Sequence, residues 1–140
     1  MDGLGAIIAF LTGWLVSQLI KVFTEWIQLG KISGREIFDL LVKSRSGGMP
    51  SGHASSFVAL TTYIGFSQGW NSSVFALAVG VAIIVIYDAI NVRRSVGEIG
   101  MVLKKEKKLN RVVEGHTVSQ VVMGGLLGVL MGWTVFLVVA

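Results

Sequence analysis

The sequence predicts an all-α protein built as a polytopic bundle of helices in a membrane. Hydrophobic residues make up 53% of the 140 residues and charged residues only 14%. A soluble domain of this size keeps too large a share of its surface exposed to hide so much apolar area. Three long stretches carry no charged residue: Leu4–Ile20, Ala54–Tyr87 and Thr117–Ala140. A helix needs roughly 20 apolar residues to cross a bilayer core, so the middle stretch allows two crossings and we expect about four transmembrane helices.

The first two elements follow from local patterns. The first helix is expected at about residues 4–29, because Gly30 is a suitable C-cap. Residues 33–43 alternate apolar and charged side chains at helical spacing, which predicts a short amphipathic helix at the interface. The second and third spans divide near Gly69–Asn71, within the polar sequence SQGWNSS.

The remaining elements complete one integral membrane domain, residues 1–140. The third span ends at IYDAINVRR, and residues 95–116 are basic enough to predict a surface helix near the headgroups. The fourth span begins near Thr117. Its small residues predict close helix packing, within the chain or between the subunits of a homodimer; they are Gly124, Gly125 and Gly128.

Basic residues predict the orientation in a cell membrane. With four spans, both termini and the SQGWNSS turn share one side, and the segments 30–50 and 91–116 share the other. The positive-inside rule places the basic side in the cytoplasm and both termini outside. The run KKEKKLNR there predicts a solvated surface that attracts anionic lipids at about 1 kcal/mol per basic residue, and no nucleic-acid partner is expected. The basic side holds Lys31, Arg35, Lys43, Arg45, Arg93, Arg94, Lys104, Lys105, Lys107, Lys108 and Arg111.

Two histidines mark the candidate site. His53 lies in GGMPSGHA and His116 in EGHTVSQ, so each follows a glycine and opens a predicted helix on the basic side. The N–H groups of a first helical turn lack intrahelical partners and attract anions. Imidazole can attack phosphorus or deliver a proton near neutral pH. We therefore predict a phosphate site at this membrane face.

Charged residues near the spans support the same interpretation. Asp88 stands inside an apolar helix, where a carboxylate costs a few kcal/mol unless it is partnered. It is expected to orient a histidine, hold an arginine or bind a metal ion. Arg93 and Arg94 also fit the simpler role of closing the third span. Lys21 is close enough to a helix end to extend its ammonium group into the headgroup region.

Three motifs follow one another along the chain: GGMPSGHA, YDAINVRRSVG and EGHTVSQVVMGGLLG. Together they resemble the divergent PAP2 family of small membrane proteins, which is related to type 2 phosphatidic acid phosphatases and vanadium haloperoxidases. The resemblance runs from about Lys21 to Gly128. It implies a PAP2-like helical core and a phosphohistidine mechanism that needs no metal or other cofactor.

The resemblance also implies residue roles. His116 matches the histidine that attacks phosphorus, and His53 the one that protonates the leaving group. The other matching positions are expected to bind phosphate oxygens, with Arg45 beside the PSGH turn; they are Lys21, Arg45, Ser51, Gly52, Arg93 and Arg94.

The sequence differs from the wider superfamily at three positions. Gln28 and Asn110 stand where the motifs have other residues. Gln120 occupies the place of the aspartate that orients the attacking histidine, and an amide cannot stabilise an imidazolium as a carboxylate does. Asp88 and Glu114 are the candidates to replace that carboxylate.

The predicted function is hydrolysis of a lipid phosphate or pyrophosphate monoester by a membrane lipid phosphatase. The candidate substrates are phosphatidate, phosphatidylglycerophosphate and isoprenoid phosphates. One alternative is a lipid-phosphate binder or transporter without turnover, which Gln120 favours. Another is a hydrolase that holds a divalent metal ion with His53, His116 and Asp88.

Overall fold

The computed structural model describes residues 2–29, 34, 48–106 and 115–139. Its elements are helices α1 (Asp2–Leu29), α3 (Gly52–Gln68), α4 (Ser73–Tyr87), α5 (Arg93–Lys105) and α6 (Val118–Val139), with a π-helical turn, η1 (Asp88–Val92), between α4 and α5. The described part of the chain contains no strand, so the all-α prediction is confirmed. The predicted interfacial helix at residues 33–43 lies almost entirely outside the described residues.

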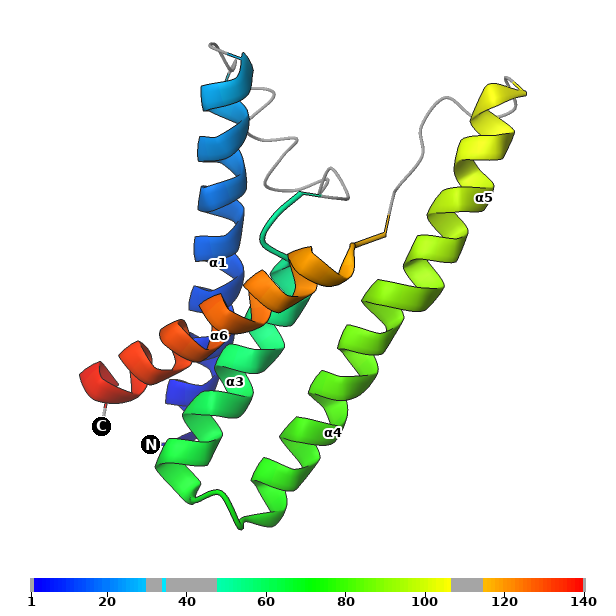
Figure 1. Ribbon diagram of the computed structural model, residues 1–140. Helices are drawn as coiled ribbons and strands as arrows, with labels where there is room; N and C mark the ends of the chain where they lie inside the picture. Colours follow the sequence, from blue (N-terminus) through cyan, green and yellow to red (C-terminus); the bar gives the residue numbers. More distant parts are fainter. Residues whose placement is uncertain (1, 30–33, 35–47, 107–114, 140) are drawn as a thin grey trace.

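Helix α3 is the centre of the bundle. It contacts α1, α4 and α6, and α6 also crosses α1. Figure 1 shows α3 between α1 and the long helix formed by α4 and α5, with α6 running obliquely across α3 and α1. The start of α1, the end of α6 and the α3–α4 turn lie toward the same end of the molecule (Figure 1), as the four-span prediction requires. The turn follows Gly69, whose positive φ of 91° favours glycine.

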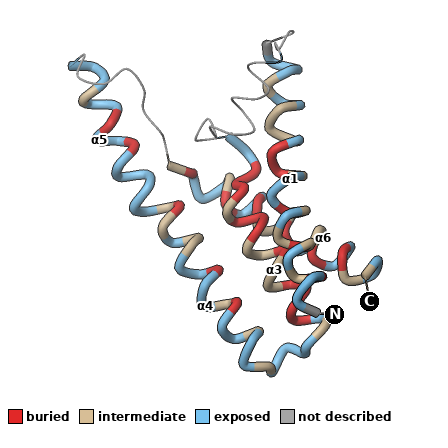
Figure 2. Tube along the Cα trace, turned by 180° about the vertical axis from the view of Figure 1, so that it is seen from behind, coloured by how far each residue is buried: buried red, intermediate tan, exposed pale blue. Residues whose placement is uncertain are grey.

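Small residues hold the bundle together, and large apolar residues face outward. The largest fully buried side chains are the serines Ser17, Ser51 and Ser55. Figure 2 shows the outward faces of α1, α4 and α6 as mostly exposed. Close backbone packing with an apolar exterior is the arrangement of membrane helices, because lipid covers the outward side chains. Examples of these exposed side chains are Leu4, Ile7, Leu19, Leu77, Ile83, Ile84, Leu126 and Leu137.

Among the described residues, three helical segments are long and apolar enough to cross a membrane: Gly3–Gln28, Ser73–Lys105 and Val118–Val139. Helix α3 is shorter, at 17 residues, or about 25 Å at 1.5 Å per residue. The chain is therefore a membrane protein with several apolar helices, and the second expected span corresponds to the short central helix α3.

One sequence prediction needs correction. Residues 95–116 were expected to form a separate surface helix, but α5 continues α4 through η1 as one helix of 33 residues. At 1.5 Å per residue this helix is about 50 Å long, longer than the roughly 30 Å bilayer core. Helix α5 therefore extends along the axis of α4 rather than turning onto the surface (Figure 1).

Candidate active site

The site begins where α3 and α6 start side by side. Ser51 is the N-cap of α3, and its hydroxyl accepts a long hydrogen bond from the Ala54 amide (3.5 Å). The Ser51 amide donates across to the main-chain carbonyl of Gln120 in the first turn of α6 (2.9 Å). This hydrogen bond holds the starts of α3 and α6 together. It therefore brings His53, in the first turn of α3, close to His116, just before α6.

A row of glycines on α6 makes this approach possible. A Cβ added at Gly124 would lie 2.5 Å from the Ser51 carbonyl oxygen, and one at Gly128 would lie 2.7 Å from that of Ser55. Both glycines therefore touch the main chain of α3, which confirms the predicted close packing at these two positions. Gly125 has nothing within 4 Å of its added Cβ and lies outside this contact.

His53 and His116 face each other across this junction. Their ring centroids are 6.5 Å apart, and the ring planes are inclined by 60°. Reacting atoms in a near-attack arrangement lie about 3–3.5 Å apart. The separation therefore suits a single phosphoryl group between one attacking nitrogen and one proton donor.

Both rings line a cavity of about 500 Å³ between α1 and α3. Its lining changes character along α1, from aromatic and aliphatic side chains to an amide and then an ammonium group. A Cβ added at Gly52 would lie 3.8 Å from Lys21 Nζ, so the lysine reaches the first turn of α3. The lining residues are Phe10, Leu11, Trp14, Gln18, Lys21, Gly52, His53, Ser56, Phe57 and His116.

The hydrogen bonds of Gln120 determine which nitrogen of His116 is free. Gln120 Oε1 accepts the amide hydrogen of Thr117 (3.0 Å) and lies 3.2 Å from His116 Nδ1. A main-chain N–H can only donate, so the shared atom is the carbonyl oxygen of the amide, and Nδ1 must carry the ring hydrogen. In the neutral ring this leaves the lone pair on Nε2, as a nucleophile requires.

His116 is buried, with 7% of its surface exposed. Burial lowers the pKa of its imidazole below the usual 6.5. The hydrogen bond to Gln120 opposes this shift, and the charges of Lys21, His53 and Arg93 add to it. The ring is therefore neutral at pH 7, and among the described residues Gln120 is the side chain bonded to it, not a carboxylate.

The π turn supports the main chain of His116. The His116 amide donates to the carbonyl oxygen of Ala89 in η1 (3.2 Å). Gly115 lies directly against α5, because a Cβ there would overlap the Arg94 main chain and lie 2.7 Å from the Arg93 carbonyl carbon. Single π turns often occur at functional sites, and this one receives the loop that carries the histidine.

The structure separates the predicted site residues into two groups. Lys21, Gly52, His53 and His116 line the cavity. Ser51 is fully buried behind it at the N-cap of α3. Arg45 lies outside the described residues, as does Glu114.

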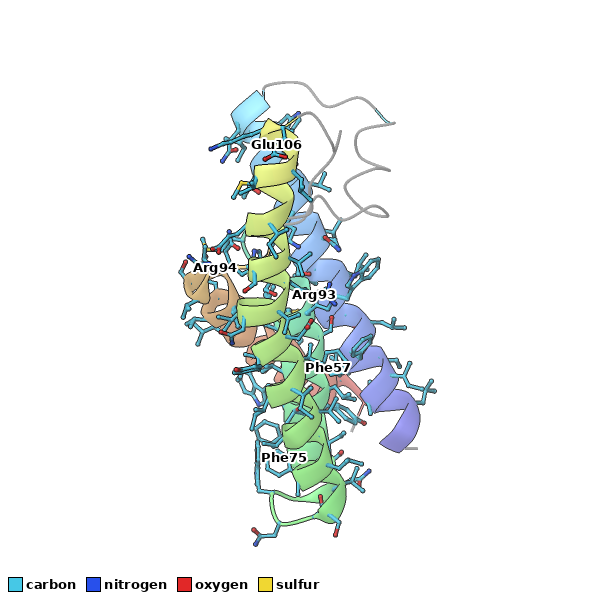
Figure 3. All side chains as sticks on the ribbon, turned by 90° about the vertical axis from the view of Figure 1, so that its right-hand side faces the viewer. Phe57, Phe75, Arg93, Arg94 and Glu106 are labelled. Carbon is cyan, nitrogen blue, oxygen red and sulfur yellow. The ribbon has the colours of Figure 1, made fainter. Side chains whose placement is uncertain are left out.

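The predicted arginines and Asp88 lie on the long helix. Figure 3 shows Arg93 and Arg94 about halfway along it, with Phe75 and Glu106 toward its two ends. Arg93 Nε lies 2.6 Å from Asp88 Oδ2, so the carboxylate holds an arginine, one of the roles the sequence left open. Arg94 pairs with Glu98 (3.2 Å) beside a smaller cavity of about 190 Å³ that His116 also borders.

The predicted metal-ligand set does not form. Within the described ranges, no group of three or more His, Cys, Asp and Glu side chains is arranged to hold a metal ion. Asp88 is engaged by Arg93 instead of joining the two histidines. The arrangement of donors therefore gives the metal-dependent alternative no support.

Sequence reasoning missed Gln18, which lines the cavity with only 4% of its surface exposed. A signal was present, because Gln18 lies three residues before Lys21 and four after Trp14. Residues three and four apart share a helix face. The amide therefore had to face the same side as the lysine.

Comparisons with known proteins cover most of the chain. The family model described as the divergent PAP2 family matches residues 5–131. The chain is also similar to the uncharacterized membrane protein YuiD of Bacillus subtilis strain 168. The two are 30% identical over 148 aligned residues, which cover 89% of this chain and 89% of that protein. No solved structure matches the chain.

Proposed function

The chain belongs to the divergent PAP2 family, and from that premise we propose that it is a membrane lipid phosphatase. It hydrolyses a lipid phosphate or pyrophosphate monoester through a phosphohistidine at His116. The observation that carries this proposal is the pair of histidine rings, 6.5 Å apart over one cavity, with the lone pair of His116 assigned to Nε2.

In the first step, His116 Nε2 attacks phosphorus and the bond from phosphorus to the lipid oxygen breaks. His53 gives its proton to that oxygen, so a lipid monophosphate releases a neutral alcohol and a lipid pyrophosphate releases the lipid monophosphate. Lys21 and the main-chain N–H groups at Gly52 stabilise the charge on the phosphoryl oxygens. The opposite placement of nucleophile and acid suits the in-line geometry of phosphoryl transfer.

In the second step, water attacks phosphorus from the side that the alcohol has left. His53, now neutral, takes a proton from that water while the bond between phosphorus and Nε2 breaks. Inorganic phosphate leaves, and both rings return to their starting states. The hydrogen bond from Nδ1 to Gln120 keeps His116 in one orientation through both steps.

A binder or transporter of lipid phosphate is the second candidate. Gln120 favours it, because a neutral amide gives less stabilisation to the cationic phosphohistidine than a carboxylate would. In that case Lys21, His53 and His116 hold the anion without turnover. Both candidates place the site on the cytoplasmic side of the membrane, following the basic residues.

Phosphate release by the purified protein from a panel of lipid phosphates tests the proposal, with and without EDTA. The expected result is turnover that survives EDTA and disappears in His116→Ala. His53→Ala is expected to lose most activity on alkyl esters but much less on a nitrophenyl ester, whose leaving group needs no proton. A labelled phosphohistidine that requires His116 supports catalysis. Lipid binding without label or release would establish the binder instead.

A further inference from the structure

The cavity has a polarity gradient along one face of α1. Phe10, Trp14, Gln18 and Lys21 all line it and follow one another at intervals of three or four residues, as one helix face requires. The side chains change in order from apolar, through an uncharged amide, to a cation. An amphiphile with its phosphate beside Lys21 would place its apolar chain along Trp14 and Phe10. The group that links the phosphate to the chain would then lie beside Gln18.

Gln18 is a buried polar residue of this face with no hydrogen-bond partner among the described residues. Only 4% of it is exposed, yet its amide makes no hydrogen bond with any residue that the structure describes. The neighbouring buried hydroxyls are all bonded: Ser17 donates to the Trp14 carbonyl (2.6 Å), Ser55 to Gly13 (2.9 Å) and Ser56 to Gly52 (2.7 Å).

An amide in this position points to a ligand. Within the described residues, Ser67 Oγ is the one fully buried polar side-chain atom without a partner, so the polar atoms of Gln18 are open to the cavity. The large majority of buried polar side chains have a protein or water partner, and for this amide the partner must come from inside the cavity. Gln18 lines the cavity rather than the lipid-facing exterior. Its N–H₂ donates to a carbonyl oxygen, and its own carbonyl accepts from a hydroxyl.

The rise per residue of α1 gives the position of Gln18 along the helix axis relative to Lys21 and Trp14. At 1.5 Å per residue, Gln18 lies about 4.5 Å along the axis from Lys21 and about 6 Å from Trp14. A glycerol phosphate bearing an acyl chain presents an ester carbonyl or a hydroxyl a few bonds from phosphorus. An alkyl or isoprenoid monophosphate presents only carbon at that distance and would leave the amide unpaired.

We propose that Gln18 is a specificity residue that selects acylglycerol phosphates over alkyl and isoprenoid monophosphates. This inference rests on the proposed function, because it assumes that the phosphate lies between Lys21 and the two histidines. The proposed substrate is therefore a phosphate ester that carries a carbonyl or hydroxyl oxygen about 4.5 Å from the phosphate, the rise along α1 from Lys21 to Gln18. Trp14, Phe10 and Phe57 then contact the apolar chain.

Two substrates with the same chain test this assignment: oleoyl glycerol phosphate and oleyl phosphate. We expect wild type to prefer the first. Gln18→Leu, which keeps the side-chain volume, should lower kcat/KM for the acylglycerol phosphate roughly 10- to 100-fold and leave that for oleyl phosphate within about two-fold. Gln28→Leu is the matched control, because Gln28 lies on the same helix and is exposed. Equal losses on both substrates in Gln18→Leu, or no preference in wild type, would overturn the proposal.

Binding separates this proposal from the proposed function. If wild type releases phosphate from neither lipid, catalysis has failed, and the shift in Tm that each lipid produces becomes the readout. The assignment is supported if the acylglycerol phosphate raises the Tm of wild type more than oleyl phosphate does, and if Gln18→Leu reduces the larger Tm shift to the oleyl phosphate value. Equal shifts with both lipids in wild type would contradict it.

Discussion

Gln120 Oε1 lies 3.2 Å from His116 Nδ1 and also accepts the Thr117 amide. An uncharged side chain thus contacts the ring where the family resemblance implies a carboxylate. It holds the ring in one tautomer, but it adds no negative charge to raise the affinity of the ring for a proton. Burial then keeps His116 neutral, which is the state that the proposed nucleophile needs at neutral pH.

Replacing Gln120 separates orientation from charge. Gln120→Glu keeps the length and adds a carboxylate, which favours imidazolium, so the acidic limb of the rate profile should move to higher pH. Gln120→Leu removes the acceptor and should lower the rate roughly 10²–10⁴-fold. The pH dependence of phosphate release measures both changes. Identical profiles for wild type and Gln120→Leu would mean that the amide does not orient the ring.

Gly115→Ala should displace His116, although Gly115 does not itself line the cavity of about 500 Å³. The new methyl group would overlap the Arg94 main chain. It would therefore break the hydrogen bond from the His116 amide to the Ala89 carbonyl oxygen in η1. A displacement of about 1 Å can cost roughly 10²-fold in rate, and overpacking costs about 1–3 kcal/mol of stability.

Phosphate release and Tm would be measured on Gly115→Ala beside Gly125→Ala. The added methyl group at Gly125 meets nothing within 4 Å, so that variant should behave as wild type. If both variants retained full activity, close contact between Gly115 and α5 would be unimportant for the site.

Acid should destabilise the protein through His116. Its pKa is lowered in the folded state by burial, so the unfolded chain takes up a proton at a pH where the folded ring does not. Stability therefore falls as pH decreases below about 6.5. Tm in detergent between pH 7.5 and 5 would measure this fall, and His116→Gln should make it shallower. An unchanged slope in that variant would assign the acid sensitivity to other groups.

Gly128→Ala should weaken the contact between α6 and α3. Its methyl group would lie 2.7 Å from the Ser55 carbonyl oxygen and 2.8 Å from Val58 Cβ, which predicts a loss of about 1–3 kcal/mol. Because this contact is within the chain, Tm should fall while the mass measured by light scattering stays the same. A change in oligomeric mass would indicate that the glycine row also joins subunits.

Single cysteines would test the orientation. The native chain contains none, so Asn71→Cys in the α3–α4 turn and Lys105→Cys at the end of α5 can be labelled selectively. Both positions are exposed. In intact cells an impermeant reagent should modify Cys at position 71 but reach position 105 only after lysis. The reverse result would place the histidines on the outer side.

The site was predictable in part. His53 and His116 could be paired from sequence because each follows a glycine at a helix start on the basic side. The close packing of Gly124 and Gly128 was predictable because small residues at this spacing permit backbone contact. Asp88 was recognisable as a carboxylate that needs a partner. Its spacing to Arg93, five residues apart, brings the two together only because η1 is wound as a π turn.

The sequence by itself determined that this chain is a helical membrane protein, and its two histidine-containing helix starts predict an anion site. Long uncharged apolar stretches are stable as helices in lipid, where every main-chain group must be bonded within the segment. Tertiary structure decided the remaining features. Gln18 and Gln120 became informative only when α1 and α6 packed on α3, because an amide in an apolar span has the same local pattern whether it meets a cavity, a histidine or another helix. Likewise, α5 continues α4 because η1 preserves the helix axis, and no local pattern in residues 95–105 specifies that direction.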